Sequence, residues 1–395
     1  MIEIKEKYNC CGCSACVQVC PKQCISMSAD NEGFLYPQVD TAICIDCGLC
    51  EKVCPVINQN EPREPLAVYA AKNNNEKIRL KSSSGGIFTL LAEHIISEGG
   101  VVFGARFNEH WDVVHDYTEN IEGLEPFKGS KYVQSVIGDS FIKAKQFLNN
   151  GRKVLFSGTP CQIAGLKKYL RKEYPNLLTV DIICHGVPGS LVWEKYKKEV
   201  VKLAKSDNNP LNSIKLFGIN FRDKTKGWRD YLCNYSVVNT ANNKVVNITN
   251  KHTQDPYMRL FLSNYSLRPS CYYCPGKAGK SRSDMTLGDC WGIKRINKSF
   301  DDNKGANVCV IHNNNELLDI ILQNSQCIKL SSNYLNNFNR SYYISSSAPN
   351  NRQAFYGAIL RTDDIISLAK LFAPPKWFIK NIKDRVIRVI KRTIS

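Results

Sequence analysis

The 395-residue sequence predicts a small, cysteine-rich α+β domain followed by a larger α/β domain with a mixed sheet. Three observations predict this fold class. A cysteine run occurs twice near the start, a strand–helix–strand pattern occupies the middle of the chain, and a strand-rich alternation follows it. The predicted boundaries are residues 1–57 for the small domain, 58–66 for a proline-containing linker, 67–372 for the large domain and 373–395 for a basic tail.

The duplicated run reads C-x-x-C-x-x-C-x-x-x-C-P, first up to Pro21 and again up to Pro55. A zinc site needs two C-x-x-C pairs, so the third cysteine and the C-P ending favour iron–sulfur clusters over zinc or disulfides. In this pattern the last cysteine of each run reaches across to the other cluster. We therefore expect one [4Fe–4S] cluster at Cys10, Cys13, Cys16 and Cys54, and a second at Cys44, Cys47, Cys50 and Cys20.

A short hairpin is expected between the two runs, with strands at residues 25–27 and 33–36 and a turn at 30–33. With these features, residues 1–60 resemble a bacterial two-cluster ferredoxin. The resemblance implies a ferredoxin-like α+β domain that holds two [4Fe–4S] clusters.

Composition limits the class of protein. Eighteen cysteines with no secretory leader and no apolar run of about 18 residues indicate reduced thiols in a cytoplasmic protein, soluble or peripheral at the inner face of the membrane. The formal net charge is +17, but residues 1–60 hold four lysines and seven acids. We see no basic stripe interleaved with aromatics, so the charge indicates anionic cofactors, acidic redox partners or a membrane surface, and no nucleic acid.

The large domain is expected to begin near Leu66 and to contain a serine–glycine loop. Ser84, Gly85 and Gly86 precede a helix over residues 87–96, and residues 101–105 form a buried strand. Free N–H groups at such a helix start can bind a phosphate, although ordinary helix capping explains the same residues. Residues 126–135 also mix cations, small residues and aromatics, as anion-binding loops do.

Residues 153–183 predict a β-α-β unit in which Cys161 and Cys184 each follow the carboxyl end of a strand. Cys271 and Cys274 form a C-x-x-C pair, which is half of a metal site, and Cys161 and Cys184 can supply the other two ligands. A helix over 191–204 and strands over 214–221, 231–238 and 244–249 lie between these cysteines.

At these motifs the chain resembles the family of the beta subunits of coenzyme F420 hydrogenases and dehydrogenases. The resemblance covers about residues 66–310 and rests on Ser-Gly-Gly at 84–86, Gly-x-Lys-Tyr at 129–132, Thr-Pro-Cys-Gln at 159–162, Ile-Cys-His-Gly-Val-Pro at 183–188, Ser-Cys-x-x-Cys at 270–274 and Ser-Asp-x-Thr-x-Gly-Asp-x-Trp-Gly at 283–292. It implies an α/β flavoprotein domain that holds FAD beside a third [4Fe–4S] cluster, whose ligands match Cys161, Cys184, Cys271 and Cys274.

The resemblance implies an oxidoreductase that passes electrons between the clusters and FAD, and reduces or oxidises a small organic molecule. Implied partners are a redox carrier such as a ferredoxin, or an electron-donating subunit. His185 and Lys131 are the expected catalytic residues, and the flavin is expected near Ser84, Gly85, Gly86, Lys131, Thr286, Gly288 and Asp289. We do not predict that the chain uses coenzyme F420, a deazaflavin, as its substrate. Family members in bacterial surface-polysaccharide loci indicate other substrates in anaerobic metabolism.

Alternatives remain open at several positions. The chain could be a non-catalytic electron-transfer subunit that serves another protein, or an iron–sulfur scaffold or sensor. His185 could donate to a ligand sulfur, relay a proton or be structural. Cys233 and Cys309 are expected in the core, and Cys290 either packs there or is a reserve ligand. Residues 374–395 predict a basic amphipathic helix that either lies on an anionic bilayer or docks on its own domain.

Overall fold

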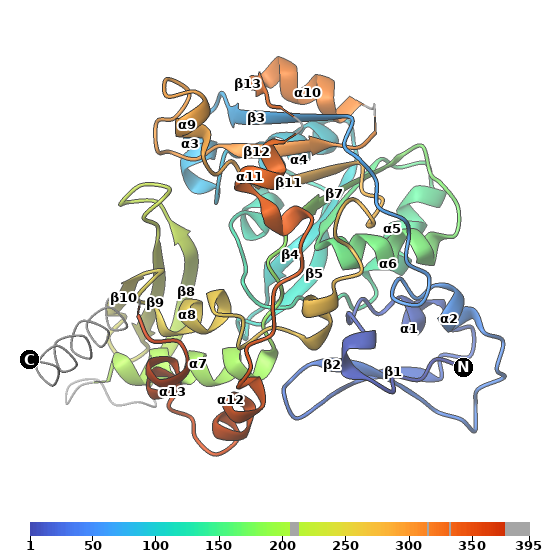
Figure 1. Cartoon of the computed structure of the whole chain (residues 1–395), viewed down its shortest axis with the longest axis horizontal. Helices are drawn as coiled ribbons and strands as arrows, with labels where there is room; N and C mark the ends of the chain where they lie inside the picture. Colours follow the sequence, from blue (N-terminus) through green and yellow to red (C-terminus); the bar gives the residue numbers. More distant parts are fainter. Residues whose placement is uncertain (206–212, 314–315, 332, 376–395) are drawn as a thin grey trace, which may run out of the picture.

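The computed structural model describes residues 1–205, 213–313, 316–331 and 333–375. Figure 1 shows the small N-terminal domain beside helices that cover a large sheet, with a second sheet on the opposite side of the molecule. The predicted fold class is confirmed, because an α+β hairpin domain is followed by an α/β domain with a mixed sheet.

The small domain is an antiparallel hairpin flanked by two short helices. Strand β1 (Ile25–Ala29) pairs with β2 (Leu35–Val39), and the hairpin joins the two cysteine runs as expected. Helix α1 (Ala15–Val19) lies in the first run and α2 (Leu49–Lys52) in the second. Each helix follows a left-handed residue, Ser14 or Gly48, so both runs make the same sharp turn.

The large sheet has the strand order β13-β3-β12-β11-β7-β6-β4-β5. Its centre is parallel and its two edges are antiparallel. This is the mixed sheet that the sequence predicted. The strands are β3 (Ala67–Asn73), β4 (Val101–Phe107), β5 (Val113–Thr118), β6 (Val154–Gly158), β7 (Leu177–Ile182), β11 (Met285–Asp289), β12 (Asn307–Ile311) and β13 (Ser325–Lys329).

Helices cover both faces of this sheet. Helices α4 (Ile87–Ser97) and α10 (Glu316–Asn324) pack on one face, where Ile87, Leu91 and Ile95 are fully buried. Helices α5 (Ser140–Asn149) and α6 (Pro160–Leu170) pack on the other face and also contact the small domain. The sheet and the small domain therefore share α5 and α6 as a common layer (Figure 1).

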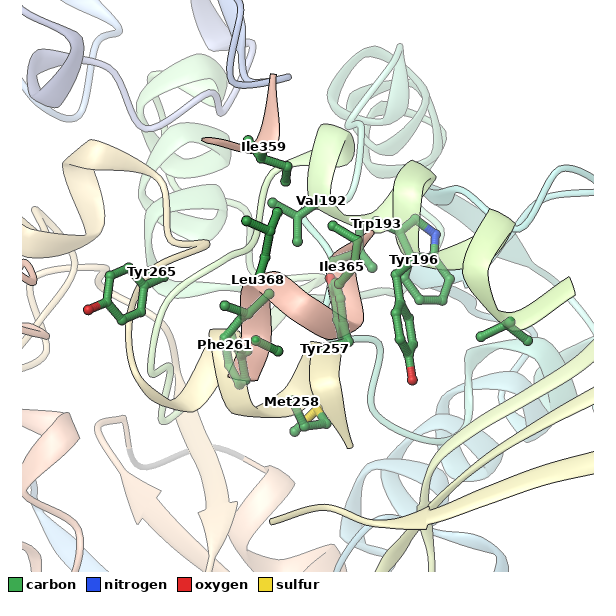
Figure 2. Close-up of a cluster of buried hydrophobic side chains, with 14 of the residues drawn as sticks. Val192, Trp193, Tyr196, Tyr257, Met258, Phe261, Tyr265, Ile359, Ile365 and Leu368 are labelled. Atoms are coloured by element: carbon green, nitrogen blue, oxygen red, sulfur yellow. The ribbon is translucent and has the colours of Figure 1, made fainter. Parts of the chain in front are cut away.

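A separate antiparallel sheet, which the sequence did not distinguish from the main one, packs against a helical cluster. Figure 2 shows buried side chains of this helical cluster. They include Trp193 and Tyr196 from the helix over Ser190–Leu203, and Tyr257 and Phe261 from the helix over Pro256–Leu262. The elements are β8 (Ile214–Asp223), β9 (Leu232–Asn239), β10 (Val245–Lys251), α7 (Ser190–Leu203), α8 (Pro256–Leu262), α12 (Arg352–Ile359) and α13 (Ile365–Phe372).

The remaining elements connect these layers. Residues 58–66 lie along the large domain, where Asn60 donates to the Lys280 carbonyl at 2.8 Å and the Leu66 N–H donates to the Ile311 carbonyl at 2.8 Å. The predicted C-terminal helix lies outside the described residues, apart from its first two positions. No helix in the described ranges is long and apolar enough to cross a bilayer. The short helices are α3 (Glu76–Lys81), α9 (Ile293–Ile296) and α11 (Tyr334–Phe338).

Candidate iron–sulfur and flavin sites

The second predicted cluster site is a pocket lined by four cysteines from both runs. Cys44, Cys47 and Cys50 come from the second run, and Cys20 reaches in from the first. The N–H of Ile2 donates to the Cys50 sulfur at 3.2 Å. This is the crossed arrangement that the sequence predicted for a two-cluster domain.

The first predicted site is more deeply buried. Cys10, Cys13, Cys16 and Cys54 are all buried, and Cys54 comes from the second run. Burial, together with the neighbouring Cys10 and Cys54, raises the pKa of Cys16 to about 12. Thiols that oppose one another's ionisation in this way are stabilised as thiolates when positive irons lie between them.

The third predicted site gathers four cysteines around the start of α6. Cys161 lies in the first turn of α6, which begins with a capping box between Thr159 and Gln162. Cys184 follows β7, the strand parallel to β6. Parallel strands end at the same sheet edge, so both cysteines lie at the edge where α/β sheets bind ligands.

The C-x-x-C pair reaches this edge through close loop packing. Cys271 lies in the turn over Pro269–Tyr273, and a Cβ at Gly276 would lie 3.0 Å from the Cys161 nitrogen. Burial raises the pKa of Cys184 to about 12; Lys277 lowers it, while Cys274 and Cys161 raise it. Burial likewise raises the pKa of Cys271, with contributions from Cys184, Cys274 and Cys161.

The donor chemistry of all three groups fits iron–sulfur clusters. All 18 cysteines are free thiols. Among the described residues, no three His, Cys, Asp or Glu side chains are arranged to hold a single metal ion. A tetrahedral zinc site draws its sulfurs to about 2.3 Å from one ion. Each thiolate of a cubane binds a different iron, so the cysteines need not converge on one point.

The predicted flavin residues lie in two places. In the first, the loop before α4 contacts the 129–132 loop, where Ser83 accepts from the Ser130 N–H at 2.6 Å. Ser84 donates to the Ala306 carbonyl at 2.6 Å. A Cβ at Gly85 would lie 2.5 Å from both the Ala71 oxygen and the Asn307 nitrogen. Gly85 therefore permits packing against β3 and β12, while Gly86 begins α4 with φ of 81°.

Two members of the last motif join this first place. Asp289 accepts from Arg222 at 3.0 Å and from the Trp228 indole at 3.1 Å, and Arg222 also donates to the Ser83 carbonyl. The Gly288 carbonyl accepts from Asn307 at 3.1 Å. Asp289 is therefore already paired within the protein.

Thr286 is not brought to this place. Its hydroxyl donates to Asp181 at 2.5 Å and lies 3.0 Å from the His312 Nε2 atom. It lines a small pocket together with Cys184 and Lys277, close to the third cysteine group. Residues 286 and 289 are separated by three positions of one strand, so their side chains point to opposite faces of the sheet.

Of the two predicted catalytic residues, His185 contacts Phe261 directly, and Lys131 is next in sequence to another residue that contacts this ring. The His185 ring packs on Phe261 at 5.1 Å, and its buried Nε2 atom has no hydrogen-bond partner among the described residues. Tyr132, next to Lys131, packs on Phe261 at 5.1 Å. Burial lowers the pKa of His185, and burial lowers the pKa of Lys131 to about 7.

Three residues that the sequence analysis did not assign lie between the cysteine groups: Cys11, Gln134 and Arg268. Cys11 packs in one buried cluster with Cys13, and Cys161 packs against the same cluster. Arg268 contacts Cys10 and Gln134. Cys11 belongs to no repeated spacing, and an arginine before a C-x-x-C pair carries no local signal of burial. Cys233 and Cys309 are fully buried, as expected for core residues, and Cys290 is fully buried as well.

Two regions of the chain match known families. Residues 9–58 match the 4Fe-4S dicluster domain, and residues 151–331 match the C terminus of the coenzyme F420 hydrogenase/dehydrogenase beta subunit. These matches cover the first two cysteine groups and all of the third.

Individual relatives match parts of the chain. A subunit of the F(420)H(2) dehydrogenase from Methanosarcina mazei is 22% identical over 213 residues, which are 51% of this chain and 60% of that protein. The coenzyme F420-dependent sulfite reductase from Methanocaldococcus jannaschii is 29% identical over 199 residues, 48% of this chain and 30% of that protein. The chain thus spans less than two thirds of either relative.

Two further similarities concern the small domain and the overall structure. The 7Fe ferredoxin from Hydrogenibacillus schlegelii is 49% identical over 43 residues, 11% of this chain and 49% of that protein. A chain of the F420-reducing [NiFe] hydrogenase complex from Methanosarcina barkeri has a TM-score of 0.42 and 15% identity, covering 78% of this chain and 93% of that one, a likeness too low to carry an argument. By its family matches, the chain is an iron–sulfur protein in which a 4Fe-4S dicluster domain is joined to a domain of the family of coenzyme F420 hydrogenase/dehydrogenase beta subunits.

Proposed function

We propose that this chain is an iron–sulfur flavoprotein oxidoreductase, in which the two-cluster domain exchanges electrons with a third cluster and FAD. The observation that carries the proposal is the position of Cys11, which packs in a buried cluster that also contains Cys13 and contacts Cys161. Cys13 belongs to the first cysteine group and Cys161 to the third. The first and third sites therefore adjoin at the interface of the two domains.

In this proposal, Cys10, Cys13, Cys16 and Cys54 hold one cluster, Cys20, Cys44, Cys47 and Cys50 hold another, and Cys161, Cys184, Cys271 and Cys274 hold the third. Cysteine-ligated clusters supply one-electron chemistry, and bound FAD supplies the conversion between one- and two-electron transfer. The protein's own part is to bury the thiols and to hold the three groups in one order. Only Cys47 among these twelve residues is exposed, which makes the second site the accessible end.

Lys131 is the residue that best fits a flavin phosphate. Its ammonium donates to the Lys128 carbonyl at 2.9 Å, and no carboxylate in the described part of the chain forms an ion pair with it. A partly buried cation without an anion is costly, so a phosphate would supply the missing charge. A Cβ at Gly129, two residues before Lys131, would meet nothing within 4 Å, which leaves this loop open to a ligand.

The test is the content of iron, acid-labile sulfide and flavin per chain after anaerobic purification. About twelve irons with one FAD support the proposal, because each cubane contains four irons. About eight irons without flavin would contradict it and favour an electron-transfer role beside a separate catalytic protein, as the name of the M. mazei relative suggests.

A pair of variants locates the flavin. Lys131→Met is expected to lower the flavin content while the iron content stays at the wild-type value. Lys81→Met is the matched control, because Lys81 is an exposed lysine at the end of α3. Equal flavin in both variants would remove Lys131 from the flavin site. Turnover with candidate donors, including reduced ferredoxin and reduced coenzyme F420, then distinguishes the substrates.

A further inference from the structure

Arg268 is a fully buried arginine at the boundary between the two domains. Its side chain has no exposed area. It precedes the C-x-x-C pair by three residues, and its carbonyl accepts from the Cys271 N–H at 2.9 Å. Its own N–H donates to the Val187 carbonyl at 3.0 Å. The backbone of Arg268 is therefore part of the loop that presents the third cysteine group.

The guanidinium points away from that loop into the small domain. Its Nε atom donates to the Cys10 carbonyl at 2.7 Å, and one terminal nitrogen donates to the Leu35 carbonyl at 2.8 Å. The same nitrogen lies 3.5 Å from the Cys10 sulfur. The guanidinium carbon lies 4.4 Å from the centre of the Tyr36 ring. Arg268 thus contacts a ligand of the first site with its charge.

Gln134 completes this contact. Its Oε1 atom accepts from Arg268 at 3.1 Å, and its Nε2 atom donates to the Cys11 carbonyl at 3.0 Å. A Cβ at Gly12 would lie 2.8 Å from both the Arg268 and the Gln134 nitrogens. The chain between Cys10 and Cys13 is therefore packed directly onto the guanidinium.

No carboxylate in the described residues forms an ion pair with this buried charge, whereas two other buried arginines have one. Arg222 pairs with Asp289, and Arg79 pairs with Asp302. A buried arginine without an anion is strongly unfavourable. The groups near it that can become negative are the thiols of Cys10, Cys11 and Cys271 and the Tyr36 phenol, with Cys10 first. A cysteine-ligated cluster carries a net negative charge.

We propose that Arg268 is the counter-ion of the cluster held by Cys10, Cys13, Cys16 and Cys54, and that its permanent charge raises the reduction potential of that cluster. The inference rests on the proposed function only in that these cysteines hold a cluster. Reduction adds a negative charge beside the guanidinium, so the reduced form gains more from Arg268 than the oxidised form does. Arg268 is a positioning residue, since it also joins this ligand loop to the loop of the third site.

The test is a redox titration of the full-length protein followed by electron paramagnetic resonance. Arg268→Gln is expected to lower the potential of the first cluster, so that the ratio of reduced to oxidised cluster at a fixed potential falls about tenfold, or 59 mV for one electron. Arg268→Lys keeps the charge and is expected to restore part of this shift. Repeating the titrations in a Cys47→Ser background, which removes a ligand of the second cluster, assigns the signal.

Two further variants make the result decisive. Gln134→Glu keeps the size of the side chain and places a carboxylate against Arg268, so it should lower the potential even if Arg268→Gln does not fold. Arg361→Gln removes one exposed arginine and should leave the potential unchanged. If Arg268→Gln and Gln134→Glu both keep the full iron content and the first cluster has the wild-type reduction potential in both, the inference is overturned. Loss of the third cluster alone would instead contradict the proposed function, because the first cluster can still be titrated.

Discussion

Gly165 of α6 lies directly against Cys13 of the first cysteine run: a Cβ atom at Gly165 would be 2.9 Å from the Cys13 sulfur. Side chains do not approach this closely in folded proteins, so the helix can reach the cysteine only because position 165 is a glycine. Because α6 begins with Pro160 and Cys161, the same contact fixes how near the third cysteine group lies to the first.

Gly165→Ala is expected to lower the iron content of the first site and to destabilise the protein by about 1–3 kcal/mol, because the added methyl group overpacks against Cys13. Helix propensity acts in the opposite direction by about 1 kcal/mol. Gly357→Ala in α12 is the matched control, because a Cβ at position 357 would meet nothing within 4 Å. This substitution should stabilise the protein, since alanine has the higher helix propensity. Iron analysis and anaerobic denaturant unfolding measure both effects. Wild-type iron and stability in Gly165→Ala would contradict the close contact.

Glu32→Gln is expected to weaken the docking of the small domain. Arg352 donates to the two Glu32 oxygens at 2.9 and 2.6 Å, with both side chains mostly buried. Removing the carboxylate leaves a buried arginine unpaired, which should cost about 1–3 kcal/mol in the free energy of unfolding. Glu173→Gln is the control, because Glu173 pairs with Lys167 while 87% exposed and should change stability by less than about 0.5 kcal/mol. Equal effects in the two variants would argue against the interdomain pair.

Asp181 is expected to make stability fall as pH rises. Burial raises its pKa from 3.8 to about 6, while hydrogen bonds from Ser281, Thr286 and Ser283 act in the opposite direction. Between these two pKa values the folded state binds more protons than the unfolded state, so the folded state is favoured at low pH. The contribution lost between pH 5 and pH 7 is about 1 kcal/mol.

Asp181→Asn removes this titration, so its free energy of unfolding should depend less steeply on pH than that of the wild type. Parallel denaturant curves at both pH values measure the difference. A wild type and variant with the same slope would show that Asp181 keeps an ordinary pKa in the folded protein.

Variants of Cys20 and Cys24 test which of these two neighbouring cysteines is a ligand of the second cluster. It lines the same pocket as the four predicted ligands, and its sulfur lies 3.4 Å from that of Cys20. Cys20→Ala should remove about four irons per chain, because a cubane needs its four thiolates. Cys24→Ala should retain them, since Cys24 lies outside the repeated spacing. Iron loss in Cys24→Ala with retention in Cys20→Ala would reverse the assignment.

The sequence predicted the elements whose signal is local. The strands around Ile214, Leu232 and Val245 and the helix after Gly86 lie where their patterns placed them, because burial periodicity and turn residues act over a few positions. The predicted fold class and the family resemblance are confirmed. They could be predicted because the cysteine spacings are short patterns that are complete within a few residues of sequence. The ligand sets, the flavin residues and the catalytic roles remain proposals.

The tertiary structure decided which of these residues meet. Thr286 and Asp289 share one motif, yet the first faces Asp181 and the second pairs with Arg222. Arg268 meets Cys10 across 258 positions of sequence, and nothing at either position predicts the contact. Local spacing determines which residue types occur and which strands and helices form. The unpaired charge of Arg268 arises only when folding removes water from the boundary between the two domains.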